Sequence, residues 1–164
     1  LKVLSGYSLP SQGVISWKTN ENQVRADMVY QQVSICAPFV SLFDRHTVKE
    51  AVYFHFNFKK LLSEIAIQEV LDFCYLQDSR NKKISQLSSG MKQRLKLALS
   101  FLSDTPFLFL DEPCANLDES AIKWYQASLK KYSKNRLVII CSNNKEEEHF
   151  MCDKTVNLAH YKHI

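Results

Sequence analysis

Glycine is scarce in this chain: its 164 residues include only Gly6, Gly13 and Gly90. A chain of this length with average composition would carry about 11 glycines. A loop that cradles phosphate with its backbone amides needs several glycines close together, because only glycine leaves room for such an approach. A glycine-rich phosphate loop is therefore not encoded within these residues.

Other features that are missing from the sequence limit further the class of protein to which the chain can belong. No apolar run approaches the roughly 18 residues of a membrane-spanning helix. The five cysteines form no C-x-x-C pair, which favours buried, reduced thiols in a cytoplasmic protein. The net charge of +4 comes without a clustered basic stripe, so no nucleic acid is expected as a partner. With 46% hydrophobic and 23% charged residues, the composition is typical of one globular domain.

The first residues read as the end of a structural element. Residue 1 is leucine, and residues 1–6 resemble the last turn of a helix that stops at a glycine cap, Gly6. We therefore expect a segment upstream of Leu1.

Strand and helix patterns alternate along the chain. Residues 47–50 have the S/T-x-x-E spacing of a capping box and open a helical region over about 47–80. Short apolar or alternating runs predict strands at residues 14–17, 33–36, 107–110, 137–141 and 155–158. Apolar spacing predicts helices behind Ser88 and Asp118, and a short polar helix at 146–148. The fold class is therefore α/β, with a parallel sheet flanked by helices.

Two adjacent carboxylates, Asp111 and Glu112, follow the apolar run 107–110. In an open parallel sheet, ligands bind at the carboxyl ends of the strands. Asp111 is suited to hold Mg²⁺ as a hard oxygen ligand, and Glu112 to polarise an attacking water. The alternative is that both acids only complement the dipole of a following helix.

A serine pair and a glycine, Ser88, Ser89 and Gly90, open the helix that leads into the carboxylate strand. Free amides at a helix start, with hydroxyl groups around them, suit an anionic phosphate, although S-S-G is also an ordinary helix cap. Asp118 follows the carboxylates at a short offset, and it too can simply cap the next helix.

Three motifs, in their order and spacing, resemble the nucleotide-binding domain of ABC transporters. They are L-S-S-G-M-K-Q-R (87–94), F-L-F-L-D-E-P (107–113) and A-N-L-D (115–118). Residues 1–13 resemble the segment that follows the family's phosphate loop. The resemblance implies a P-loop NTPase-like sheet with an inserted helical subdomain at about 47–103. Residues 1–164 would then be an ABC-type ATP-binding domain that lacks its N-terminal strands and phosphate loop.

The resemblance also implies function and partners: an ATPase on the cytoplasmic face of the membrane, using ATP and Mg²⁺ and bound to a transmembrane permease and to a second nucleotide-binding domain. Asp111 matches the magnesium ligand and Glu112 the general base. Asn143 stands where the family has a switch histidine, and is expected to contact the γ-phosphate. Four further residues match positions that act across a head-to-tail dimer: Ser88, Ser89 and Gly90 in the signature that closes over the partner's ATP, and Asp118 in the D-loop.

Several positions depart from the family pattern. Ser89 and Met91 replace a glycine and a glutamine of the signature, and Ala37 or Pro38 stands where a glutamine senses the γ-phosphate and Mg²⁺. Asn143 accepts and donates hydrogen bonds but carries no positive charge, so transition-state stabilisation should be weaker.

Two alternative functions remain open for a chain with these motifs and departures. The chain could be a non-catalytic regulatory or structural subunit, because phosphate-contacting elements are absent or altered. It could also be a soluble ABC-type ATPase without a membrane partner, which duplicated domains or long basic linkers would favour; the chain shows neither.

Overall fold

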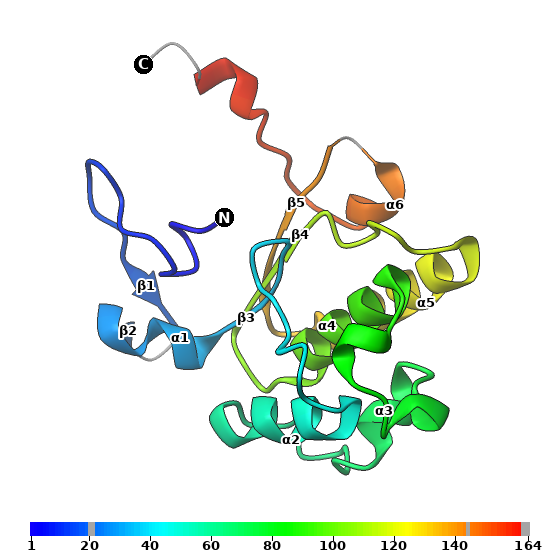
Figure 1. The fold of residues 1–164 in the computed structure, drawn as a ribbon. Helices are drawn as coiled ribbons and strands as arrows, with labels where there is room; N and C mark the ends of the chain where they lie inside the picture. The colour runs from blue at the N-terminus through cyan, green and yellow to red at the C-terminus, as the bar shows by residue number, and fades with distance from the viewer. Residues whose placement is uncertain (20–21, 144, 162–164) are drawn as a thin grey trace.

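A parallel sheet of three strands forms the centre of the computed structural model, which describes residues 1–19, 22–143 and 145–161 (Figure 1). The middle strand β4 (Phe107–Asp111) lies between β3 (Val33–Cys36) and β5 (Leu137–Cys141) and runs parallel to both. Each parallel pair requires a crossover, and helices supply it. The predicted α/β class with a parallel sheet is thus confirmed.

The side chains of β4 alternate between two hydrophobic clusters. Leu108 and Leu110 belong to the larger core, which includes buried residues of the long helices. Phe107 and Phe109 point into a smaller cluster with Val29. Both faces of β4 are therefore covered, which explains its continuous apolar run. In Figure 1 the helices α4 and α5 lie on one side of the sheet, and β1 and α1 lie on the other.

Two helices of equal length, α4 and α5, follow the predicted caps, and shorter helices surround them. The remaining elements form a small antiparallel hairpin and several single turns. The α-helices are α1 (Val29–Gln32), α2 (Val48–Phe58), α3 (Glu69–Phe73), α4 (Ser89–Leu102), α5 (Glu119–Tyr132) and α6 (Glu146–His149). The hairpin strands are β1 (Trp17–Lys18) and β2 (Gln23–Val24), and 3-10 turns lie at Ala26–Met28, Gln77–Ser79, Ile84–Gln86 and Leu158–Tyr161.

Local capping signals are confirmed where the sequence places them. The Thr47 hydroxyl accepts from the Glu50 amide at 3.2 Å, and the Glu50 carboxylate accepts from the Thr47 amide at 2.8 Å. Gly6 has a φ of 74°, its amide donates to the Val3 carbonyl, and the next amide, of Tyr7, donates to Lys2. This pair of bonds is a Schellman motif, so the chain does begin on a helical turn that a glycine closes.

Two strand predictions need correction, and a third is confirmed. Residues 14–17 do not form one strand: pairing begins only at Trp17, and Val14 is almost fully exposed, with no strand beside it in the part of the chain that the structure describes. Residues 155–158 are exposed and pair with no strand in the described part of the chain, and Leu158 instead begins a 3-10 turn. The strand predicted at 137–141 is confirmed as β5, which is mostly half-buried and, among the described residues, pairs only with β4. Periodicity alone does not supply the neighbouring strand that a ladder needs.

None of the helices among the described residues is long and apolar enough to cross a membrane.

One half-buried histidine makes the stability of this fold depend on pH. His55 on α2 contacts the Ser103 hydroxyl at 2.9 Å, and that hydroxyl donates to the Leu99 carbonyl, so the neutral imidazole donates through Nε2. Burial, aided by the nearby charge of Lys59, lowers the pKa of His55 to about 4 from 6.5. Between these values the unfolded chain binds a proton that the folded chain does not, so stability falls as the pH falls from 6.5 to 4.

We expect this group to remove about 3 kcal/mol of stability over that range, since one pKa unit corresponds to about 1.4 kcal/mol. Urea unfolding at pH 4 to 7 of the full-length protein and of its His55→Gln variant isolates the contribution, because other titrating groups act in both proteins. The variant should lose less stability on acidification. Identical pH profiles in the two proteins would contradict this assignment.

Candidate active site

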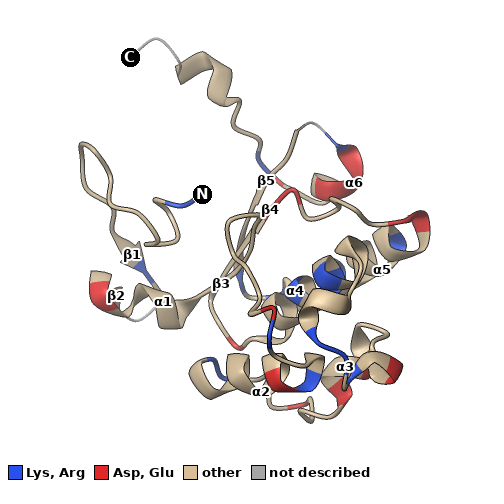
Figure 2. Cartoon of the chain, viewed as in Figure 1, with Lys and Arg blue, Asp and Glu red and all other residues tan. Residues whose placement is uncertain are grey.

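The two carboxylates arrive at the carboxyl edge of the sheet. Asp111 is the last residue of β4 and pairs in register with Cys141 at the end of β5. Glu112 follows directly, and both side chains are half-buried. The placement expected for these residues at the ligand-binding edge is therefore observed. Figure 2 shows the acidic end of β4 near the acidic helix α6.

Glu112 has a strained backbone that other groups hold in place. Its φ of 46° lies in the left-handed region, which side-chain-bearing residues rarely adopt. The Glu112 amide donates to the Cys141 carbonyl at 2.9 Å, and its carbonyl accepts from the Ala115 amide at 3.0 Å. The Asn143 side-chain amide donates to the Glu112 carboxylate. Residues from two neighbouring strand ends thus meet at one carboxylate.

The serine–glycine segment begins α4. The Ser88 hydroxyl caps the helix by accepting from the Met91 amide at 3.2 Å, while Ser89 is the first helical residue and is exposed. A Cβ added to Gly90 would lie 2.8 Å from the Asn116 carbonyl oxygen. Gly90 is therefore needed because the backbone of the turn after β4 passes so close to the helix.

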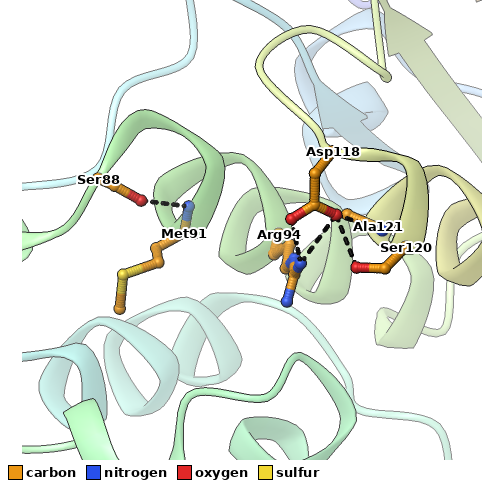
Figure 3. A network of polar contacts seen from close by, with 6 residues as sticks. All are labelled: Ser88, Met91, Arg94, Asp118, Ser120 and Ala121. Carbon is orange, nitrogen blue, oxygen red and sulfur yellow. Dashed lines mark hydrogen bonds and ion pairs between the residues drawn. The ribbon is translucent and has the colours of Figure 1, made fainter.

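Asp118 caps α5 and also contacts α4 (Figure 3). Its carboxylate accepts from the Ser120 hydroxyl at 2.7 Å and from the Ala121 amide at 2.8 Å, and Arg94 of α4 lies 3.4 Å away. The Ser120 hydroxyl, followed by the Ala121 amide, lowers the pKa of Asp118. The helix-capping interpretation is confirmed, and the Arg94 contact joins this acid to the helix that Ser88 begins.

The predicted residues form two groups. One holds Asp111, Glu112 and Asn143 at the sheet edge. The other joins the start of α4 to the turn before α5, through Gly90 and Asp118. Within the described ranges, no hydrogen bond or ion pair connects the two groups. The turn 113–117 is their covalent link, and Gly90 contacts it.

Sequence reasoning missed the residues that hold this turn. Gln93 is buried in α4 and donates from Nε2 to the Pro113 carbonyl at 2.9 Å. Glu148 is buried in α6 and accepts from the Cys114 amide at 3.1 Å. Gln93 could have been found, because it lies four residues before Leu97 on the buried side of the helix. Nothing in the run 146–148 distinguishes one glutamate from its neighbours.

The carboxylates at the sheet edge provide only some of the oxygen ligands that Mg²⁺ needs. Across the described ranges, no three His, Cys, Asp or Glu side chains cluster so as to hold a metal. Mg²⁺ in phosphoryl-transfer sites is typically held by one or two carboxylates together with phosphate oxygens and water, so a single carboxylate such as Asp111 fits that mode.

The architecture and edge carboxylates define a P-loop NTPase-like cassette. Solved structures with this fold include the dimeric bacterial ABC transporter cassette MJ0796, at a TM-score of 0.72 and 17% identity, covering 91% of this chain and 70% of that one. The same cassette bound to ADP and Pi in a post-hydrolysis state gives a TM-score of 0.73 at 19% identity, with the same coverage.

The ABC transporter family model matches residues 1–115, so the chain belongs to the ABC transporter family. Its relatives include the human ATP-binding cassette sub-family A member 2, 25% identical over 99% of this chain, and the Nod factor export ATP-binding protein I of Burkholderia lata, 29% identical over 94%. The chain spans 7% of the first relative and 52% of the second. The resemblance stated from the motifs is thus confirmed.

Proposed function

We propose that this chain is the ATP-binding and ATP-hydrolysing part of a protein that energises an ABC membrane transporter. The observation that carries the proposal is the meeting of Glu112 and Asn143 beside Asp111 at the carboxyl edge of the sheet. A carboxylate fixed by a neighbouring amide is suited to orient a water for attack on a phosphoryl group. Family membership and the cassette fold support the same reaction class.

Each residue has a role in this proposal. Asp111 would hold Mg²⁺, which neutralises charge on the phosphate oxygens when bound. Glu112 accepts the proton of the attacking water, and Asn143 keeps the carboxylate aligned and donates to the γ-phosphate. Because Asn143 adds no positive charge, it stabilises a developing oxyanion only through its hydrogen bond.

A second cassette is the proposed partner at the signature face. Ser88 and Ser89 are exposed at the start of a 14-residue helix, where free amides and hydroxyls can contact phosphate oxygens of ATP held by the other copy. Asp118, exposed and held ionised by its hydrogen bonds, would communicate across the dimer. The relative MJ0796 is itself described as dimeric.

A transmembrane permease is the proposed partner at α2, which would place the chain on the cytoplasmic face of the membrane. Phe43, Phe54 and Phe58 are exposed by 59%, 41% and 64%. The Phe43 and Phe54 rings pack edge-to-face and the Phe54 and Phe58 rings pack at a tilt, with centroids 5.2 Å apart in each pair. A contiguous exposed aromatic surface of this kind is typical of a protein–protein contact. The helical subdomain proposed at about 47–103 contains most of this surface.

Substituting Asn143 tests the proposed site chemistry. In the full-length protein, Asn143→Ala should lower the rate of ATP hydrolysis about 10-fold or more, because Glu112 loses its aligning partner. Asn143→His restores a donor that can also carry positive charge, so its rate should equal or exceed that of the wild type. Phosphate release at saturating ATP measures both. Wild-type turnover in Asn143→Ala would remove Asn143 from the site.

A further inference from the structure

A carboxylate outside the predicted site is buried directly behind it. Glu148 lies on the four-residue helix α6 and has 0% exposure, while its neighbour Glu146 is exposed. One carboxylate oxygen accepts from the Cys114 amide at 3.1 Å, and the other has no hydrogen-bond partner among the described residues. Burying a carboxylate with so few partners is costly, so the arrangement calls for a reason.

The group that Glu148 binds belongs to the strained turn. Cys114 lies two residues after Glu112, whose φ of 46° must be maintained by its surroundings. Gln93 of α4 binds the preceding residue, Pro113, from its own helix. The Glu148 backbone carbonyl in turn accepts from the buried Tyr125 hydroxyl of α5 at 2.7 Å. Two helices, α4 and α6, therefore bind two consecutive residues of this turn, and α5 holds α6 in place.

The segment after β5 contacts both Glu112 and the turn that follows it. Asn143 binds the Glu112 side chain, and Glu148 binds the backbone turn that sets its direction. The Ser142 hydroxyl accepts from the Lys145 amide at 3.1 Å, which closes the short connection between them. A shift of this segment would move both contacts together.

We propose that Glu148 is a positioning residue for the hydrolytic reaction: it holds the Pro113–Cys114 turn so that Glu112 stays aligned, without touching the substrate. The role rests on the proposed function of Glu112. It requires a hydrogen-bond acceptor at this position rather than a negative charge, because the contact is to a neutral backbone amide.

The test compares Glu148→Gln, Glu148→Ala and the control Glu146→Ala in the full-length protein, with rates expressed per ATP-binding site. Glu148→Gln retains an acceptor oxygen of the same reach, so its kcat should stay within about threefold of the wild type. Glu148→Ala should lower kcat at least 10-fold with KM for ATP unchanged, since ATP does not contact this residue. Glu146→Ala should behave as the wild type. Equal losses in the Gln and Ala variants, or an unchanged kcat in Glu148→Ala, would overturn the proposal.

Amide hydrogen exchange tests the contact between Glu148 and the Cys114 amide without measuring ATP hydrolysis. In Glu148→Ala the Cys114 and Ala115 amides should exchange at least 10-fold faster, while the amides of β4 keep their protection. Tyr125→Phe removes only the hydroxyl that holds the helix, and should produce the same change to a smaller degree if the alanine variant does not fold. Unchanged exchange at Cys114 in both variants overturns the positioning role. Faster exchange in a protein that hydrolyses no ATP supports it and contradicts the proposed function instead.

Discussion

We expect the replacement of Glu112 with glutamine to abolish ATP hydrolysis by the full-length protein and to leave ATP binding intact. Glutamine keeps the size of the side chain and an oxygen that can accept from Asn143, but it does not take up a proton at neutral pH. General-base catalysis contributes about 10²- to 10⁴-fold, so a loss of at least 100-fold is expected. Binding should survive because the glutamate acts on the water.

Equilibrium binding of a fluorescent ATP analogue, measured beside phosphate release, separates these two outcomes. The matched control is Glu119→Gln, an exposed acid at the start of α5 whose side chain pairs only with Lys123 within the described residues. The control should retain full turnover. Hydrolysis by Glu112→Gln at near the wild-type rate would exclude Glu112 as the base.

Replacing Gly90 with alanine should damage both the stability and the activity of the cassette. The added Cβ would meet the Asn116 carbonyl oxygen at 2.8 Å, and backbone on both sides leaves no flexible side chain to yield. Overpacking of this kind costs about 1 to 3 kcal/mol. Either the start of α4 or the turn after Glu112 has to move, so turnover should fall about 10-fold or more.

Thermal unfolding and phosphate release of Gly90→Ala together measure this effect. Lys92→Ala in the same helical turn is the control, because within the described ranges the one polar contact of its side chain is a 3.5 Å pair with the exposed Asp44. A Gly90→Ala variant with wild-type stability and turnover would show that this approach of helix and turn is not needed.

Features encoded by neighbouring residues could be predicted from the sequence. The capping box of Thr47 and Glu50, the caps at Ser88 and Asp118, and the central strand Phe107–Asp111 all depend on contacts within a few residues or on a continuous apolar run. Residues 155–158 alternate between polar and apolar as a strand does, but no strand lies beside them among the described residues. A strand at 155–158 would need a partner strand from elsewhere in the chain, and sequence periodicity does not show whether one is present.

In the candidate site, too, the features set by neighbouring residues could be predicted, and those that depend on distant residues could not. Asp111 and Glu112 could be placed at the sheet edge because a parallel strand carries its last residues there. The Asn143 contact to Glu112 brings together the ends of two adjacent strands, which a parallel pairing of β4 and β5 makes possible. Glu148 could not be predicted, because its burial depends on how α6 packs over the turn after Glu112 and not on its own sequence neighbours.

The proposal that this chain carries the hydrolytic carboxylates of an ABC cassette is tested most directly by steady-state phosphate release from ATP. Release by the full-length protein is measured with and without Mg²⁺ and is compared with release by Glu112→Gln. Phosphate release should require Mg²⁺ and should disappear in Glu112→Gln. Wild-type release no greater than that of Glu112→Gln, with or without Mg²⁺, would contradict the proposal and favour a non-catalytic role for the cassette.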